Sequence, residues 1–172
     1  MIVETWKHLS VDLDSTLADT RHRKGIIEKY VLAGKPVDWD EYAKACLADP
    51  PTPTVALIQM WQKMGGFWHV VSGRSEGARF PTALWLEEHE LTPLTIHLED
   101  DPDKHTVLGH TAWKVGRVLE VAQEWPIFAH IDDWAEVGDY LNANTEIRGI
   151  TVVPPGMYPA HRDNPSGAVS PV

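Results

Sequence analysis

Five short runs of β-branched and apolar residues alternate along the chain with longer segments that have helical spacing. Each run ends at a turn or a polar residue, and the runs cover residues 7–13, 67–72, 94–98, 127–131 and 149–153. Strands that alternate with helices of about a dozen residues form βαβ units, in which the strands are parallel. We therefore expect an α/β fold of three layers, with a mostly parallel sheet covered by helices on both faces.

Four segments between these runs have the apolar spacing of helices that bury one face. The apolar positions are Val55, Leu57, Ile58, Trp61 and Met64; Ala83, Leu84, Leu86 and His89; Trp113, Val115, Val118 and Val121; and Val137, Tyr140 and Leu141. The longest interval without a predicted strand is 15–66, and its first half is polar and rich in turn residues. This interval predicts a small helical insert at about residues 19–52, above the sheet.

The length of 172 residues suits one domain, which we place at residues 1–153. Residues 154–172 contain five prolines and predict a loose C-terminal tail. The net charge of −10 argues against a protein that coats nucleic acid or an anionic membrane. A single cysteine, Cys46, excludes an internal disulfide and favours the cytoplasm. The start of the chain lacks an apolar signal core, and no apolar run is long enough to span a membrane.

Polar side chains follow the predicted strands at the points where the strands end. They are Asp12 and Asp14 with Thr16 after the first strand; Ser72, Gly73 and Arg74 at the end of the second; Asp132 and Asp133 at the end of the fourth; and Lys114 in the preceding helix. Ligands bind outside the carboxyl ends of the strands in an open parallel sheet. We therefore expect four carboxylates, a serine hydroxyl and one or two cations to meet at one edge of the sheet.

Each of these elements also has a purely structural interpretation. An acidic pair is common in loops and often caps a helix, and a lone lysine on a helix is usually solvated. Ser-Gly-Arg is an ordinary turn between a strand and a helix. The functional interpretation depends on all four elements occurring in this order, each at a strand end or in a helix beside one.

This combination closely resembles the haloacid dehalogenase superfamily of aspartate-nucleophile phosphotransferases, from about Trp6 to Val153. The resemblance implies a three-layer Rossmann-like fold with a small helical cap insert. It implies Asp12 as nucleophile, Asp14 as general acid and base, and Lys114 and Ser72 as contacts to the phosphate. It also implies Mg²⁺ as cofactor, bound by Asp12, the backbone carbonyl of Asp14 and the pair Asp132 and Asp133.

A finer resemblance is carried by the stretches DWDEY, ADPP, VVSGRSEGAR, WKVGRV and IDDW. They look like the phosphatase domain of polynucleotide kinase/phosphatases and its stand-alone phage and bacterial relatives. The chain contains no GxxxxGK[ST] phosphate loop, so we expect no kinase half in this sequence. The resemblance implies Mg²⁺-dependent hydrolysis of phosphomonoesters at nucleotide or nucleic-acid 3′-phosphate ends.

Two alternatives remain open at this stage. A free 5′(3′)-nucleotidase uses the same catalytic groups and differs only in the insert. A catalytically silent binding module could keep the fold, although a binding module needs no general acid. The sequence implies no protein partner.

The chain departs from the polynucleotide phosphatases in ways that affect substrate length. Those relatives often carry arginine after the third strand and after the paired aspartates; this chain has Trp134 at the second place and, at the first, the acids Glu99, Asp100, Asp101 and Asp103. These two departures predict that the protein recognises only the terminal one or two nucleotides of a substrate. Arg23, Arg74 and Arg79 remain as candidate substrate contacts, with surface ion pairs as the alternative. Thr16 and Gly73 are further candidates for binding the substrate. Trp39 and Trp134 are candidates for stacking on a base.

Overall fold

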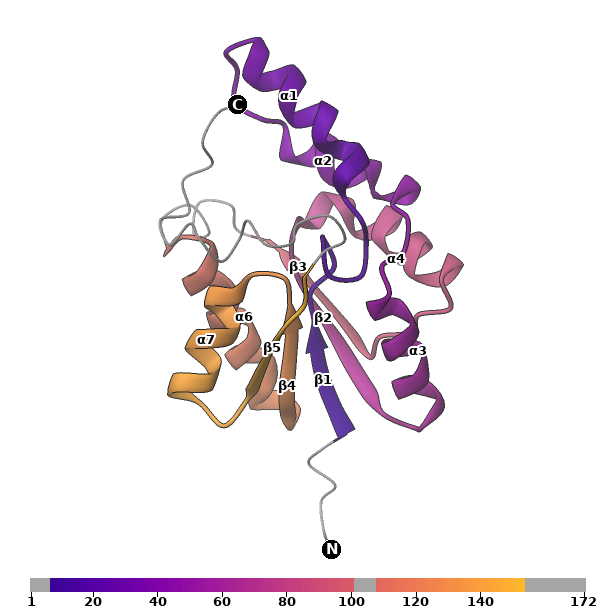
Figure 1. Cartoon of the computed structure of the whole chain (residues 1–172), viewed down its shortest axis with the longest axis vertical. Helices are drawn as coiled ribbons and strands as arrows, with labels where there is room; N and C mark the ends of the chain where they lie inside the picture. The colour runs from indigo at the N-terminus through magenta and orange to yellow at the C-terminus, as the bar shows by residue number, and fades with distance from the viewer. Residues whose placement is uncertain (1–6, 101–107, 154–172) are drawn as a thin grey trace, which may run out of the picture.

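The structure is a computed structural model that describes residues 7–100 and 108–153. The predicted tail and the acids Asp101 and Asp103 lie outside the described residues. All five predicted strands form, and they are β1 (His8–Val11), β2 (Phe67–Ser75), β3 (Thr95–Glu99), β4 (Ile127–Asp132) and β5 (Arg148–Thr151). They make one parallel sheet in the order β3-β2-β1-β4-β5, with β1 in the centre (Figure 1). The prediction of an α/β fold with a parallel sheet is confirmed.

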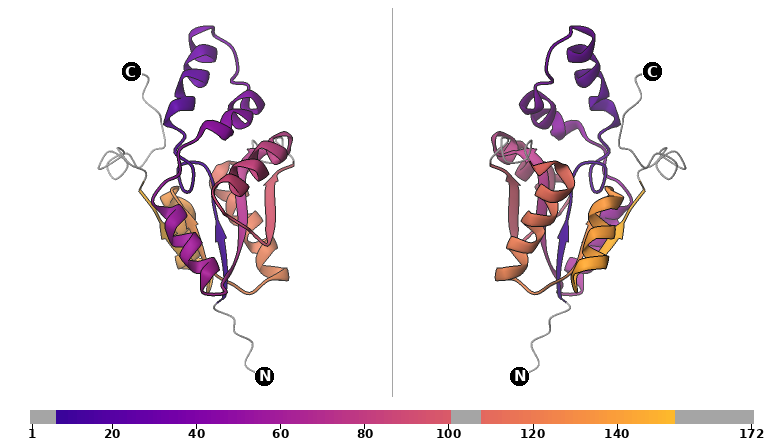
Figure 2. Two further views of the ribbon diagram at one scale, coloured as in Figure 1. Left: turned by 90° about the vertical axis from the view of Figure 1, so that its right-hand side faces the viewer. Right: turned by 90° about the vertical axis from the view of Figure 1, so that its left-hand side faces the viewer.

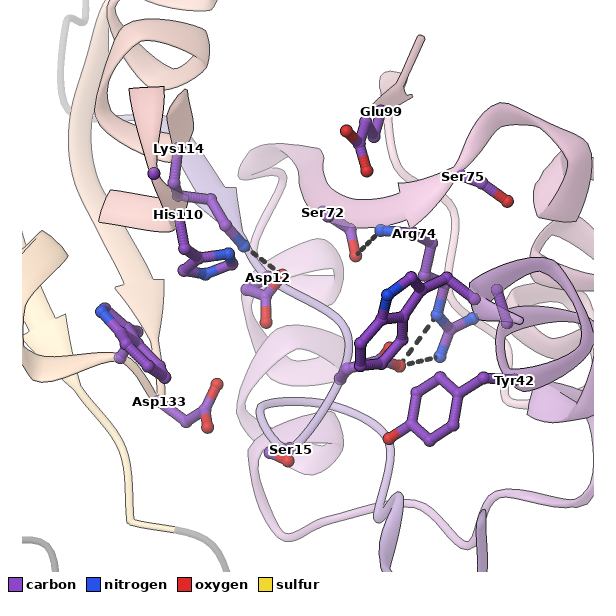
Figure 3. A pocket seen from close by; sticks show the side chains of 16 residues that line it. Asp12, Ser15, Tyr42, Ser72, Arg74, Ser75, Glu99, His110, Lys114 and Asp133 are labelled. Atoms are coloured by element: carbon purple, nitrogen blue, oxygen red, sulfur yellow. Dashed lines mark hydrogen bonds and ion pairs between the residues drawn. The ribbon is translucent and has the colours of Figure 1, made fainter. Parts of the chain in front are cut away.

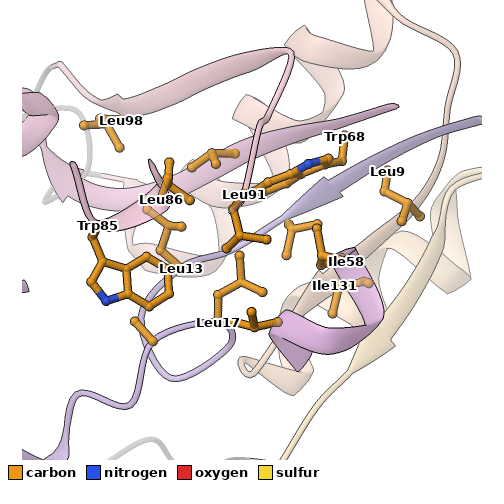
Figure 4. Close-up of a cluster of buried hydrophobic side chains, with 14 of the residues drawn as sticks. Leu9, Leu13, Leu17, Ile58, Trp68, Trp85, Leu86, Leu91, Leu98 and Ile131 are labelled. Atoms are coloured by element: carbon orange, nitrogen blue, oxygen red, sulfur yellow. The ribbon is translucent and has the colours of Figure 1, made fainter. Parts of the chain in front are cut away.

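The four predicted core helices also form, and Figure 2 shows helices on both sides of the sheet. They are α3 (Thr54–Lys63), α4 (Arg79–Glu88), α6 (His110–Glu124) and α7 (Ala135–Asn144). Helices α3 and α4 share one buried cluster with Trp68 and Val70 of β2, as Figure 4 shows in part. Helices α6 and α7 share a second cluster with Val71. Because neighbouring strand residues point to opposite faces, the two clusters lie on opposite faces of the sheet.

The predicted helix faces include positions that the structure leaves exposed on three of the helices. Leu57 and Met64 of α3 are 59% and 67% exposed, Tyr140 of α7 is 47% exposed, and Ala83 and Leu84 of α4 are also exposed. Helix α3 buries only Val55 and Ile58 among its predicted apolar positions, because it contacts the sheet along a narrow stripe. Apolar side chains beside such a stripe remain in solvent, which is common in soluble proteins.

Residues 19–52, which we call the cap, lie beyond the carboxyl ends of the strands (Figure 1). They contain helices α1 (Lys24–Leu32) and α2 (Trp39–Lys44) and the 3₁₀ turns Arg21–Arg23 and Ala45–Ala48. The chain enters and leaves the cap through two adjacent backbone segments. The Asp19 amide donates to the Pro50 carbonyl at 2.8 Å, and the Thr52 amide donates to the Leu17 carbonyl at 2.8 Å. No helix within the described ranges is long and apolar enough to cross a membrane.

Candidate active site

A cavity of about 630 Å³ lies between the carboxyl ends of the strands and the cap (Figure 3). The strand ends and α6 contribute charged and hydroxyl groups, and α2 of the cap contributes aromatic rings. Its lining residues are Asp12, Asp14, Ser15, Trp39, Tyr42, Ala43, Ser72, Gly73, Arg74, Ser75, Glu99, Gly109, His110, Lys114, Asp133 and Trp134. The predicted convergence of strand ends is therefore present in the structure, and two groups of charged residues occupy it.

The first group, which we call the carboxylate cluster, consists of Asp12, Asp132, Asp133 and Lys114. The Lys114 ammonium donates to Asp12 Oδ1 at 2.5 Å and lies 3.4 Å from Asp132 Oδ2. It also donates to the Val71 carbonyl at 3.3 Å, so backbone as well as carboxylate holds it in place. Lys114 is buried although it lies on a helix, so it is not a solvated surface residue.

The carboxylate cluster has an excess of negative charge. Burial raises the pKa of Asp12 to about 7, although Lys114 opposes the shift and Asp132 adds to it. Burial and the neighbouring carboxylates Asp12 and Asp132 raise the pKa of Asp133 to about 8. One oxygen from each of the three acids lies within 4.8 Å of the others. A buried set of hard oxygen donors with one lysine fits a divalent cation of the Mg²⁺ type.

Asp132 is the most firmly held of the three acids. Its Oδ1 accepts a hydrogen bond from the Trp134 amide at 2.8 Å, and its Oδ2 accepts one from His130 Nε2 at 3.0 Å. Burial opposes ionisation, but Lys114 and the His130 hydrogen bond hold the pKa of Asp132 well below its usual range. Asp132 is therefore an ionised carboxylate of fixed orientation.

The turns beside the cluster place the predicted hydroxyl groups. Ser72 is buried at the cavity wall, and its hydroxyl accepts a hydrogen bond from the Arg74 amide at 3.4 Å. After Asp14 the chain reverses at Ser15, whose φ of 64° lies in the left-handed region. This turn places Thr16 where its hydroxyl donates to Asp133 Oδ1 at 3.4 Å. Thr16 therefore supports an acid of the cluster, and it is absent from the cavity lining given above.

The second group, which we call the arginine cluster, consists of Arg23, Arg74, Asp14 and Asp49. Asp14 Oδ1 accepts from Arg23 Nη2 at 2.6 Å and from Arg74 Nε and Nη2 at 2.9 and 2.6 Å. Burial opposes ionisation of Asp14, but Arg74 and Arg23 hold its pKa below the usual value. The Asp14 carboxylate thus faces the arginines and is not one of the three clustered metal-ligand candidates.

Asp49 was not among the predicted site residues. Its carboxylate accepts from Arg23 Nε at 2.9 Å and Nη2 at 2.7 Å, and from Arg74 Nη2 at 3.3 Å. Both arginines are buried, which rules out surface ion pairs for either. The signal for Asp49 was available in the ADPP stretch, but an acid in a turn has no distinguishing feature until its partners are known.

Aromatic rings border the cavity on two sides. On the cap side, Trp39 is 60% exposed and makes an edge contact with Tyr42, with ring centroids 5.7 Å apart. On the α6 side, Trp134 and His110 make an edge contact at 5.0 Å. The Ser75 hydroxyl donates to Asp40 of α2, which links the cap to the end of β2. The cavity can therefore accept a flat aromatic group near the anionic centre.

No protein-family model and no curated protein matches this sequence. Solved structures do match. The chain aligns with a polypeptide of the Pnkp1/Rnl/Hen1 complex at a TM-score of 0.68 and 19% identity, over 87% of this chain and 47% of that one. It aligns with the class C acid phosphatase of Bacillus anthracis with bound tungstate at 0.62 and 18%, over 90% and 69% of the two chains.

A third alignment decides the type of fold. A haloacid dehalogenase family enzyme of Bacteroides thetaiotaomicron, in a magnesium complex, matches at a TM-score of 0.51 and 12% identity, over 94% of this chain and 100% of that one. This chain has the haloacid dehalogenase fold. The fold implied by the sequence motifs is thereby confirmed. The chain spans about half the length of the Pnkp1-complex polypeptide that it matches.

Proposed function

We propose that this haloacid dehalogenase-fold protein is a Mg²⁺-dependent phosphomonoester hydrolase that works through an aspartyl-phosphate on Asp12. The observation that carries the proposal is the carboxylate cluster. In it Asp12 accepts a hydrogen bond from Lys114, and one oxygen each of Asp12, Asp132 and Asp133 lie within 4.8 Å of one another. An anionic nucleophile cannot approach a phosphate dianion unless positive charge is supplied. Bound at the three carboxylates, Mg²⁺ would supply that charge and polarise the phosphoryl oxygens.

Asp12 attacks phosphorus, and the bond between phosphorus and the leaving oxygen breaks. Lys114, the Ser72 hydroxyl and the amides of the strand-end turns stabilise the charge on the equatorial oxygens. Water then attacks the phosphorus of the aspartyl-phosphate, which releases inorganic phosphate and restores Asp12. Asp14 gives a proton to the leaving oxygen in the first step and takes one from the water in the second.

The two roles proposed for Asp14 require different protonation states: a protonated carboxyl in the first step and an ionised carboxylate in the second. The three N–H bonds from Arg23 and Arg74 favour the ionised form, which suits the second step. In the first step, phosphate oxygens of the substrate would compete for the N–H groups of Arg74, which lines the cavity, whereas Arg23 lies outside the lining and stays bonded to Asp14. Asp14 then loses hydrogen bonds that favour its charge, and its pKa rises toward that of a proton donor.

The proposed substrate is a nucleotide or a nucleic-acid 3′-phosphate end. Trp39 and Trp134 at the cavity border offer rings on which a base can stack. One similar structure is that of the Pnkp1/Rnl/Hen1 RNA repair complex, and this similarity supports a nucleic-acid end as the substrate proposed for this chain. The cavity volume of about 630 Å³ also favours a free nucleotide as the second candidate.

A panel of nucleoside 3′- and 5′-monophosphates and short 3′-phosphorylated oligonucleotides tests the proposal. We expect Mg²⁺-dependent release of phosphate, preference for the 3′ position, and kcat/KM for mononucleotides and oligonucleotides within about tenfold of each other. Preference for 5′-monophosphates would favour the free nucleotidase. Absence of phosphate release from every substrate, with Mg²⁺ present, would overturn the proposed activity.

A further inference from the structure

A buried chain of hydrogen bonds runs from the centre of the sheet to the carboxylate cluster. Ser10 of β1 lies 2.9 Å from His130 Nδ1, and His130 Nε2 lies 3.0 Å from Asp132 Oδ2. Ser10 and His130 are both 0% exposed. None of the catalytic steps proposed above uses either residue.

The chemistry of the partners fixes the direction of these bonds. A carboxylate can only accept, so the hydrogen between His130 and Asp132 is on Nε2. In the neutral ring Nδ1 is then an acceptor, and the Ser10 hydroxyl donates to it. The Asp132 carboxylate thus selects the tautomer with hydrogen on Nε2, and the Ser10 hydroxyl, bonded to Nδ1, holds the ring in the plane in which Nε2–H points at Asp132.

His130 also determines which way Asp132 can turn. The Trp134 amide holds Oδ1, and His130 holds Oδ2, while Lys114 lies 3.4 Å from that same Oδ2. Without the His130 bond, Oδ2 is free to move toward Lys114 and form a closer ion pair. Such a pair would compete with a cation for the carboxylate.

A neighbouring histidine shows that burial alone does not give this arrangement. His69 of β2 is also 0% exposed, and its hydrogen-bond partners are His8 at 3.1 Å and Thr95 at 2.8 Å. It belongs to the same sheet, but its bonds lead away from the carboxylate cluster. His69 therefore provides a matched control for His130.

We propose that His130, oriented by Ser10, is a positioning residue for the metal ligand Asp132. This inference rests on the proposed metal-dependent function. Residues that orient a metal ligand through its outer hydrogen bonds typically change metal affinity by about 10- to 100-fold when they are replaced. His130 acts on the cation through Asp132 and does not bind the cation itself.

The test measures Mg²⁺ and Mn²⁺ binding to the metal-free full chain by calorimetry, without substrate. We expect His130→Leu to weaken binding by about 10- to 100-fold. Ser10→Ala should weaken it by a smaller factor, His130→Gln should restore part of the affinity through its amide donor, and His69→Leu should leave it unchanged. In the wild-type protein, nitrogen-detected NMR should place the His130 proton on Nε2.

The outcomes separate this inference from the proposed function. If the wild-type protein binds neither cation, the metal-dependent function fails and the inference fails with it. If the wild-type protein binds and the His130 variants bind equally well, only the inference is overturned. Equal weakening by His69→Leu would also overturn it, because the effect would then be one of packing. If His130→Leu does not fold, Ser10→Ala and His130→Gln decide the question.

Discussion

The two charged clusters at the cavity are built from the same kinds of side chain but differ in charge balance. The carboxylate cluster has three acids and one lysine, whereas the arginine cluster has two acids and two arginines. The first raises the pKa of its own members Asp12 and Asp133 to about 7 and about 8. In the second, the arginines hold the pKa of Asp14 below its usual value despite burial, while burial raises the pKa of Asp49 only to about 6 because the same arginines oppose it.

This difference indicates separate tasks for the two clusters. A buried cluster with uncompensated negative charge is unstable until it takes up a proton or a cation. A buried cluster whose charges balance has no need of an external ion, and it can fix the position of the groups within it. We therefore assign cation binding to the carboxylate cluster and the positioning of Asp14 to the arginine cluster.

The largest expected effect is the loss of turnover in Asp12→Asn. The amide has nearly the shape of the carboxylate but cannot attack phosphorus, so kcat should fall by about a thousandfold or more. Far-ultraviolet circular dichroism checks that the fold is kept. A variant that retains a substantial fraction of the wild-type rate, purified free of other phosphatases, would remove Asp12 from the role of nucleophile.

Replacing an aspartate by asparagine should lower the unfolding free energy in the arginine cluster but not in the carboxylate cluster. Asp49→Asn leaves two buried arginines with one carboxylate. Breaking a buried ion pair typically costs about 3–5 kcal/mol. We expect a loss of unfolding free energy at or just below the bottom of this range, about 2–3 kcal/mol, because burial already raises the pKa of Asp49 to about 6.

Asp133→Asn, in contrast, replaces an acid whose raised pKa already disfavours its charge at this site, and it keeps an acceptor for the Thr16 hydroxyl. The metal-free variant should be as stable as the wild type or more stable. Urea unfolding at pH 7.5 without metal measures both variants. Equal destabilisation by the two substitutions would show that the charge balance of the clusters does not matter.

Mg²⁺ should stabilise the folded protein through the carboxylate cluster and not through the arginine cluster. A cation that binds only the folded state at a hundredfold excess over its Kd adds about 2.7 kcal/mol, which is roughly 5–10 °C in Tm for a chain of this size. Asp133→Asn should reduce this rise, and Asp49→Asn should preserve it. Thermal melts at constant ionic strength provide the measurement, and an unchanged wild-type Tm would contradict the cation site.

The smallest expected effect is a pH dependence of the metal-free protein between pH 7 and 8.5. The folded state holds protons on Asp12 and Asp133 that an unfolded carboxyl, with a pKa near 3.9, has already lost. Stability should therefore fall as pH rises through 7 to 8, by up to about 1.4 kcal/mol per pH unit for each proton.

Two controls assign this slope to the carboxylate cluster. Mg²⁺ at the proposed site would keep the carboxylates ionised and should abolish the slope, and Asp133→Asn should reduce it. The buried histidines with lowered pKa values, such as His69 at about 4, are neutral in the folded state and, above about pH 7.5, almost entirely neutral in the unfolded state, so they add little to the slope there. A rise in stability with pH over this range would contradict the assignment.

The sequence predicted the strands and the residues at their ends because both depend on local patterns. Alternating segments of β-branched and helical spacing located β1 to β5, and the parallel topology then brought Asp12, Ser72 and Asp133 to one edge. The roles of these residues stay predictions until the variants are measured. The contacts of Arg23 and Arg74 with Asp49 could not be predicted from local patterns, because they join residues that are 26 and 25 positions apart in the sequence.

His130 shows a signal that was present and was not used. It lies within the predicted strand 127–131, and the structure buries it fully. Residues two apart on a strand point to the same face, so His130 and Asp132 had to be neighbours. A polar residue two positions before a candidate metal ligand on a buried strand is therefore worth testing as a support for that ligand.

The two adjacent backbone segments through which the chain enters and leaves the cap have a consequence for protein engineering and for the evolutionary divergence of the insert. Because the Asp19 amide donates to the Pro50 carbonyl, the two ends of the insert lie side by side, and we expect that its length can change without altering the sheet. Grafted modules of other sizes could therefore replace it on this scaffold. Only Arg23 and Asp49 bring charge from the insert to Asp14, so a transplanted module that lacks both would leave Arg74 as the sole remaining arginine of that cluster.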